Sequence, residues 1–217
     1  MTAPDVVAVI LAGGMGERLG GAVKANIEIG GMPLLARVTA ALGDGVAALL
    51  VAHGRHPPAA LALAARHIPI PDLPADYGGP LAGLAAVVAW CAQHDRAPHY
   101  LLSVAVDTPF FPHDFLPRAR AAIEPGLPGV LARCGGQDYP TDALWRFASI
   151  AALPDEVLAG TAPRSLRRYA AFIGAVALDW PAGPAGDPFA SLNTPQDRLA
   201  LEARAAIAPP DAGGDKR

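Results

Sequence analysis

The chain contains few lysines and few cysteines. Of its 17 basic residues only Lys24 and Lys216 are lysines, so arginine carries nearly all of the positive charge. The formal net charge of −3 predicts no broad attraction to nucleic acid or to an anionic membrane surface. The two cysteines, Cys91 and Cys134, fit no metal or redox spacing. We therefore expect reduced thiols in a cytoplasmic protein.

A long hydrophobic run is also missing. The longest apolar stretch, residues 81–92, is interrupted by Gly83 and is too short to span a bilayer. Residues 1–5 lack the charged start of a signal peptide, and an apolar segment with a cleavage site does not follow. The chain is 52% hydrophobic and 17% charged, so 217 residues are enough for one domain with its own core.

Short apolar runs alternate with stretches of helical spacing along the chain. Strands are expected over residues 6–11, 46–52, 100–106, 130–133, 143–147 and 175–178. Helices are expected over residues 34–42, 59–67, 81–94, 114–123, 165–173 and 195–207, the last with Thr194 as its N-cap. This alternation predicts βαβ units and a mainly parallel sheet in one domain over residues 1–207. Residues 208–217 are proline, glycine and charge, and are expected to form a frayed tail.

A glycine-rich loop follows the first expected strand and ends on a lysine. Gly13, Gly14 and Gly16 allow backbone N–H groups to face a polyanion without side chains in the way. Arg18 adds a planar fork of donors. The glycine spacing matches neither the dinucleotide fingerprint nor the Walker A loop. Lys24, a rare lysine in an arginine-rich chain, favours a phosphate pocket because its ammonium is compact, although an ordinary glycine turn with a surface lysine is the alternative.

Two further segments are expected at the same edge of the sheet, since the carboxyl ends of parallel strands meet there. Asp107 follows the strand expected over 100–106, where a carboxylate can hold Mg²⁺ together with substrate phosphates or, alternatively, cap its own turn. In residues 71–87, two acids and a glycine pair precede a helix whose N-terminus can receive an anion or a polar base edge. Gly83 lies in its first turn and costs about 1 kcal/mol relative to alanine. A close approach by a ligand or a neighbouring backbone would account for it.

Six segments of the chain, taken in order, carry the motifs of one known family. LAGGMGERLGG followed by Lys24 resembles the pattern LAGG-x-(S/G)-x-R-M-G-G-x-D-K, and DYGGPLAGL matches a GPLAG segment. VDTPFFP resembles CDTPF-x-P, and DYPTDALWR resembles HPT-x-AL. RSLRRY resembles a basic helix, and DPFASLNTPQD resembles F-x-N-x-NTPED. From residue 6 to about residue 205, the chain thus resembles the molybdenum cofactor guanylyltransferases, the MobA family of nucleotidyltransferases.

The resemblance implies a three-layer α/β/α domain with a mainly parallel, Rossmann-like nucleotidyltransferase sheet. It implies transfer of GMP from GTP to the phosphate of molybdenum-molybdopterin, with release of pyrophosphate and with Mg²⁺ as cofactor. The implied catalytic residues are Lys24, Arg18 and Asp107; Asp107 is also the implied metal ligand, and Asp72 the acid that reads guanine. The implied nucleotide-binding residues are Leu11, Ala12, Gly13, Gly14, Gly16, Lys24, Asp72, Gly79, Pro80, Leu81 and Asp107.

On the acceptor side, Ser191 and Asn193 are expected to contact the metal or the pterin phosphate. Arg164, Arg167 and Arg168 are expected to bind the incoming pterin phosphate, and an exposed basic helix face is the alternative. The expected partners are GTP and molybdopterin, with transient contact to a molybdopterin-supplying protein or to target molybdoenzymes. Neither nucleic acid nor membrane is expected as a partner.

Several positions depart from the family pattern. Val23, Ala25, Ala52, Val106, Tyr139 and Ser191 stand where the family usually has aspartate, glycine, asparagine, cysteine, histidine and asparagine, respectively. Two alternatives therefore stay open. One is a nucleotidyltransferase of the same fold that uses CTP or another phosphate acceptor, such as a sugar phosphate. The other is a non-catalytic paralogue that binds nucleotide or pterin, although a pure carrier would have no need of a metal-binding aspartate.

Overall fold

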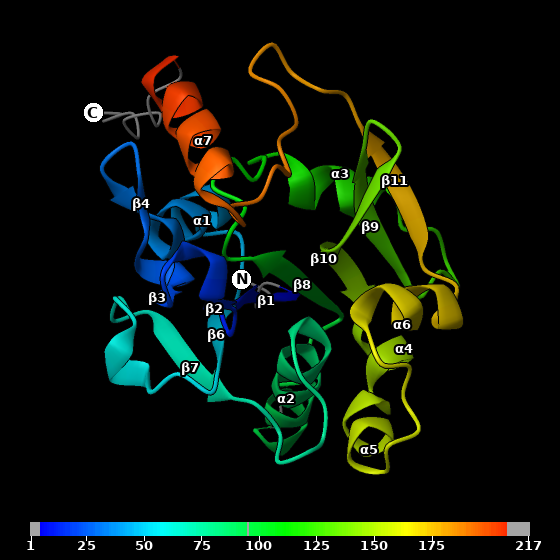
Figure 1. Cartoon of the computed structure of the whole chain (residues 1–217). Helices are drawn as coiled ribbons and strands as arrows, with labels where there is room; N and C mark the ends of the chain where they lie inside the picture. The colour runs from blue at the N-terminus through cyan, green and yellow to red at the C-terminus, as the bar shows by residue number, and fades with distance from the viewer. Residues whose placement is uncertain (1–4, 95, 208–217) are drawn as a thin grey trace, which may run out of the picture.

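A seven-stranded sheet in the order β11-β9-β10-β8-β1-β6-β7 forms the centre of the protein (Figure 1). The structure is a computed structural model that describes residues 5–94 and 96–207. The strands of the sheet are β1 Val6–Leu11, β6 Ala48–Gly54, β7 His67–Pro71, β8 Tyr100–Ala105, β9 Gly129–Cys134, β10 Gln137–Arg146 and β11 Val176–Trp180. Within this sheet β10 runs antiparallel to β8 and β9, and the other pairs are parallel. The expected mainly parallel α/β sheet is confirmed.

Helices and short strands complete the described part of the chain. The helices are α1 Leu34–Leu42, α2 Pro80–Gln93, α3 Phe115–Ala122, α4 Phe147–Ile150, α5 Leu153–Leu158, α6 Leu166–Ile173 and α7 Pro195–Ile207. Two small hairpins pair β2 Met15–Gly16 with β3 Ala22–Val23, and β4 Glu28–Ile29 with β5 Met32–Pro33. Short 3₁₀ turns cover Glu17–Leu19, Lys24–Asn26 and Pro58–Ala60. In the described ranges, no helix has the length and apolar character needed to cross a membrane.

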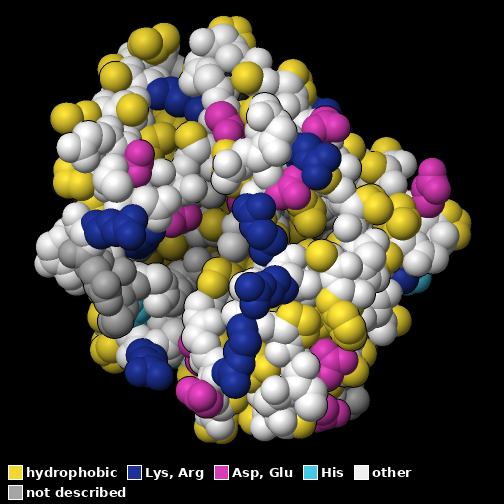
Figure 2. All heavy atoms as spheres, turned by 45° about the vertical axis from the view of Figure 1, so that its right-hand side comes forward, with side chains coloured by type: hydrophobic (Ala, Val, Ile, Leu, Met, Phe, Trp, Pro, Cys, Tyr) yellow, Lys and Arg dark blue, Asp and Glu magenta, His cyan; other side chains and the backbone are white. Residues whose placement is uncertain are grey.

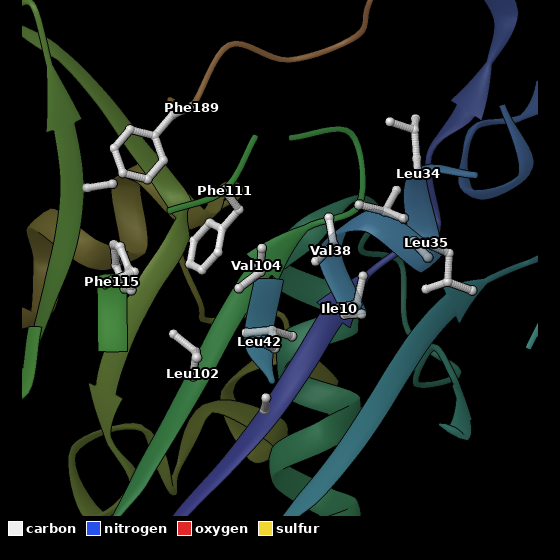
Figure 3. Packing of buried hydrophobic residues seen from close by; sticks show 14 of the residues in the cluster. Ile10, Leu34, Leu35, Val38, Leu42, Leu102, Val104, Phe111, Phe115 and Phe189 are labelled. Atoms are coloured by element: carbon white, nitrogen blue, oxygen red, sulfur yellow. The ribbon is translucent and has the colours of Figure 1, made fainter. Parts of the chain in front are cut away.

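Two hydrophobic clusters cover the two faces of the sheet, and β1 contributes to both. Ala8 and Ile10 pack into the cluster under α1 and α3, whereas Val7 and Val9 pack into the cluster under α2 and α5. Figure 3 shows Ile10 beneath the α1 side chains, with the Phe111 and Phe115 rings nearby. Burial of each such aliphatic side chain contributes about 1.5–3 kcal/mol. A strand buried on both faces is why residues 6–11 read as a continuous apolar run.

One expected helix is absent. Residues 59–67 do not form the helix that their alanine content suggested: a 3₁₀ turn ends at Ala60, and the chain then enters β7 at His67. A short helix there would bury little, since Leu61 is buried but its neighbours are half-buried or exposed, and short helices need such packing. β7 contains Pro69 and Pro71 and was therefore missed; it is an edge strand, where a proline removes no ladder hydrogen bond.

The remaining expectations differ from the structure mainly at element ends. The strand expected over 143–147 belongs to the longer strand β10, and α4 and α5 were not expected. The predicted start of the last helix is confirmed, because Thr194 Oγ1 accepts from Asp197 N and Asp197 Oδ2 accepts from Thr194 N at 2.7 Å. The predicted tail, residues 208–217, lies outside the described residues.

Candidate active site

A cavity of about 280 Å³ opens at the carboxyl ends of β1, β6 and β8. This is the edge at which open α/β sheets bind ligands. Several residues singled out from the sequence line the cavity: Leu11, Gly13, Gly14, Lys24, Asp72, Gly79, Pro80, Asp107 and Ser191. Ala52, Gly83, Ala105, Val106 and Thr141 complete its lining. The topology thus brings together segments from both ends of the chain.

The glycine loop is held against the end of β6. Ala12 N donates to Ala52 O at 2.8 Å. A Cβ on Gly13 would lie 3.0 Å from Gly54 Cα, and a Cβ on Gly54, whose φ is +61°, would lie 2.8 Å from Gly13 Cα. Both positions therefore need glycine so that the two backbones can touch. Gly54 was not predicted from the sequence, although a glycine two residues after an expected strand was the available signal.

The ammonium of Lys24 joins the two sides of the cavity. Its Nζ donates to Asp107 Oδ2 at 2.7 Å and to Asn193 Oδ1 at 2.7 Å. Only 12% of the Lys24 side chain and 19% of the Asp107 side chain are exposed, so Lys24 is not an ordinary surface lysine. Gly14 lies under this side chain, since a Cβ there would be 3.7 Å from Lys24 Cδ. The positive charge of Lys24 and the negative charge of Asp107 thus lie in contact in the lining of the cavity.

A bulge in β10 supplies the wall beside Asp107. The pairing of β10 with β9 shifts between Tyr139 and Ala143, and Thr141 in this interval lines the cavity. The Asp142 carboxylate, 1% exposed, accepts from Ala105 N at 3.1 Å and from the Thr141 hydroxyl at 3.2 Å. Burial, with a further contribution from the charge of Asp107, raises the pKa of Asp142 to about 8. Asp142 was missed, although an acid directly before an expected strand was a visible signal.

On one side of the cavity, the start of α2 packs closely against the ends of β1 and β6. A Cβ on Gly83 would lie 3.0 Å from Ala52 Cβ and 3.3 Å from Leu11 Cδ2, so neighbouring side chains account for this glycine. Asp72 follows β7 and lines the cavity. Burial raises the pKa of Asp72, and the charges of His53 and Arg55 oppose this effect. A partly desolvated carboxylate here is a strong acceptor for N–H groups of a ligand.

Other expected residues lie outside the cavity lining. Ala12 and Leu81 are buried in the hydrophobic clusters, and a Cβ on Gly16 would lie 2.6 Å from Ala22 O in the small hairpin. Arg18 is exposed in the turn Glu17–Leu19. The Asn193 side chain reaches Lys24 from the segment before α7.

The three arginines near α6 are exposed. Arg164 Nη1 donates to Asp76 O at 2.7 Å, and Arg167 Nη2 donates to Asp138 O at 3.1 Å. Arg164 also lies over the Tyr77 ring, 4.6 Å from its centroid. On the face turned forward in Figure 2, Lys and Arg side chains follow one another across the middle of the molecule. Two of the three arginines thus contact segments that lead into the cavity wall.

The fold and the cavity together define an α/β protein with a lysine and a carboxylate in contact at the carboxyl edge of its parallel strands. A model of the MobA-like NTP transferase domain matches residues 8–179, and the chain belongs to this family of nucleotidyltransferases. The chain is 35% identical over 208 residues to a molybdenum cofactor guanylyltransferase of Rhodopseudomonas palustris strain HaA2, with 95% of each chain covered. It is 36% identical over 200 residues to one of Rhodobacter capsulatus, covering 92% of this chain and 96% of that one.

Solved structures show the same fold at lower sequence identity. Molybdopterin-guanine dinucleotide biosynthesis protein A from Archaeoglobus fulgidus superposes with a TM-score of 0.68 at 21% identity, over 93% of this chain and 99% of that one. The 2-C-methyl-D-erythritol 4-phosphate cytidylyltransferase from Thermus thermophilus gives a TM-score of 0.60 at 18% identity, over 92% and 98%. The expected nucleotidyltransferase architecture is confirmed.

Proposed function

We propose that this protein transfers GMP from GTP to the phosphate of molybdopterin, forming the guanine dinucleotide cofactor and releasing pyrophosphate. The observation that carries the proposal is the contact of Lys24 with Asp107 and Asn193 in a cavity walled by the glycine loop. The names of relatives at 35% and 36% identity, matched over nearly their full length, support this choice of substrates.

The reaction joins two polyanions, so positioning and charge neutralisation carry most of the catalysis. An oxygen of the pterin phosphate attacks the α-phosphorus of GTP, and the bond to the β-phosphate oxygen breaks as pyrophosphate leaves. The backbone of Gly13 and Gly14 would hold the leaving phosphates, and Arg18 would reach them from its exposed turn. Lys24 would offset the charge that accumulates at the α-phosphate. A phosphate monoester is largely ionised at neutral pH, so no strong general base is required.

The residues present fit a magnesium ion. Asp107 Oδ2 already attracts a cation, the Lys24 ammonium at 2.7 Å, and its carboxylate lines the cavity. Within the described residues, no group of three or more His, Cys, Asp or Glu side chains could hold a metal. Mg²⁺ commonly binds through one or two carboxylates plus substrate phosphates, so a single aspartate is sufficient. When held by Asp107, Mg²⁺ would neutralise negative charge on the substrate phosphates.

The chemistry of the base side favours GTP over CTP. The Asp72 carboxylate is an acceptor, and the Watson–Crick edge of guanine offers two N–H donors, at N1 and the 2-amino group, whereas the same edge of cytosine offers only its 4-amino group. Ala52 replaces an amide that the family usually has, so it contributes only a methyl group to this wall. Asp72 therefore carries more of the discrimination here.

Calorimetric titration with GTP, CTP, ATP and UTP, with and without Mg²⁺, tests the proposal. Of the four nucleotides, we expect only GTP to bind tightly. Mg²⁺ should strengthen the binding of GTP, and Lys24→Ala should weaken it. Release of pyrophosphate with molybdopterin as acceptor then measures turnover, with Asp107→Ala as the inactive control. Preference for CTP would instead indicate a cytidylyltransferase, and GTP binding without turnover would indicate a carrier.

A further inference from the structure

The segment 187–193 contributes Ser191 to the cavity lining, and one aspartate fixes the start of the segment. The Tyr139 hydroxyl donates to Asp187 Oδ2 at 2.5 Å, and Asp187 Oδ1 accepts from Phe189 N at 2.8 Å. Arg204 of α7 donates to the Asp187 carbonyl at 2.5 Å. Asp187 thus links the β10 bulge, α7 and its own segment.

The middle of the segment is buried among aromatic rings. Phe189 is fully buried, and its ring centroid lies 5.4 Å from that of Tyr139 and 5.6 Å from that of Trp180. Figure 3 shows Phe189 beside Phe111 and Phe115. Such aromatic pairs contribute beyond the burial of their area. The ring of Tyr139 therefore packs against the segment that its hydroxyl anchors.

The end of the segment reaches the reacting groups. Leu192 N donates to the Asp107 carbonyl at 2.9 Å. On either side of Leu192, Ser191 lines the cavity and Asn193 Oδ1 accepts from Lys24 Nζ. The preceding residues 181–186 are exposed. Without the Tyr139 hydroxyl, the Asp187 carboxylate would lose its hydrogen bond to β10, whereas Arg204 would still hold the Asp187 carbonyl next to this exposed stretch.

We propose that Tyr139 and Asp187 are positioning residues for the acceptor phosphate, because together they hold Ser191 and Asn193 at the cavity. This role rests on the proposed function. Neither residue lines the cavity, so both would act through Ser191 and Asn193. Tyr139 stands where the family usually has histidine. In this chain a phenol hydroxyl therefore makes the hydrogen bond to Asp187, a contact that we call the tether. Burial and the neighbouring Asp187 raise the pKa of Tyr139, so its hydroxyl keeps the proton that it donates throughout the neutral range.

The variant Tyr139→Phe tests the tether because it keeps the ring and removes the hydroxyl. We expect kcat/KM for molybdopterin to fall by about tenfold or more, since small misplacements near a reacting phosphate are costly. The Kd for GTP, measured by calorimetry, should stay within about twofold, since the nucleotide side of the cavity is unchanged. Hydrogen exchange of the amides in 187–193 should become faster, which reports the tether independently of activity.

Tyr77→Phe is the matched control, since the Tyr77 hydroxyl is buried and donates to Ala162 O at 2.5 Å, and Tyr77 does not line the cavity. It should leave hydrogen exchange in 187–193 unchanged. Tyr139→Phe and Asp187→Asn should also be non-additive in a double-mutant cycle, because both break the same contact.

Two results would overturn the inference. One is unchanged exchange in 187–193 in Tyr139→Phe, and the other is an equal loss of GTP affinity and acceptor kcat/KM. A wild-type protein that binds GTP but transfers nothing to molybdopterin would instead contradict the proposed function, and the acceptor role with it. An active wild type with unaltered acceptor kinetics in Tyr139→Phe would contradict this inference alone.

Discussion

The Lys24 ammonium lies 2.7 Å from Asp107 Oδ2, an oxygen of the carboxylate that we propose as the metal ligand. A metal that binds Asp107 without nucleotide is repelled by this ammonium, whereas a nucleotide brings phosphates that give Lys24 another partner. We therefore expect Lys24→Met to bind Mn²⁺ alone about five to ten times more tightly than wild type, because a competing cation is gone. The same variant should bind GTP at least about tenfold more weakly. Electron paramagnetic resonance of free Mn²⁺ and calorimetry measure the two affinities.

Arg120→Met is the control for net charge. Arg120 forms an exposed pair with Asp5 at 3.8 Å and lies outside the cavity lining. Its replacement should leave the Mn²⁺ affinity unchanged. If both variants strengthen Mn²⁺ binding equally, overall charge and not the Lys24–Asp107 contact sets the affinity. If Asp107→Asn binds Mn²⁺ as wild type does, the metal site is elsewhere.

Asp142 gives the stability of the protein a pH dependence of predictable sign. Burial raises its pKa to about 8, above the unfolded value, so the folded state holds this proton more tightly. The resulting stability is present at low pH and is lost as the pH rises through about 8. Asp142→Asn keeps an acceptor for Ala105 N and cannot ionise. From pH 5 to pH 9 the variant should gain more than about 1 kcal/mol relative to wild type, since one pKa unit is about 1.4 kcal/mol. Urea unfolding at several pH values measures this, and parallel curves would refute it.

At the level of elements, β1 and β6 meet through Gly13 and Gly54, and this contact positions the glycine loop. A Cβ at Gly54 would lie 2.8 Å from Gly13 Cα, so Gly54→Ala must displace the loop. We expect at least about a tenfold loss of GTP affinity, because the loop backbone holds the phosphates. Gly43→Ala is a matched control: its φ is +59°, close to the +61° of Gly54, but nothing lies within 4 Å of the added atom. Both variants should lose about 1–3 kcal/mol of stability, because a residue with a Cβ is strained at a positive φ. Equal GTP affinities in the two variants would argue against the positioning role of this contact.

Elements with a local signal were predictable from the sequence. Residues 6–11 and 34–42 form the expected strand and helix, since a run buried on both faces and a helical apolar spacing are local patterns. The helix predicted over 59–67 was wrong, because the segment has little apolar surface to bury and helix propensity alone does not stabilise so short a helix. The direction of β10 and its bulge follow from partners in β8 and β9, which no local pattern contains.

The site was predictable to the same extent. Lys24 was singled out as a rare lysine at the end of the glycine-rich loop, and Asp107 as an acid directly after an expected strand; the structure brings their side chains together. Gly54, Thr141 and Asp142 were missed because their roles depend on atoms distant in the sequence; Asp142, for example, accepts from an amide 37 residues away. The hydrogen bond from Tyr139 to Asp187 joins residues that are 48 apart in the sequence, so it could not be predicted for the same reason.

Across the whole molecule, the cavity walls come from the β1 loop, the end of β8, the start of α2, the β10 bulge and the segment before α7. Because these elements belong to both hydrophobic layers, a ligand bound there should stabilise the fold as one unit. At 100 times its Kd, a ligand adds about 2.7 kcal/mol to the free energy of unfolding. For a domain of this size that corresponds to a rise in Tm of roughly 5–10 °C.

We expect GTP with Mg²⁺ to produce this rise in a single calorimetric transition and CTP at the same concentration to produce less. Ile10→Ala should lower the starting Tm but leave the rise unchanged, because Ile10 is in the core and outside the cavity lining. A rise confined to one of two resolved transitions would mean that the two layers unfold separately and that the cavity reports on only one of them.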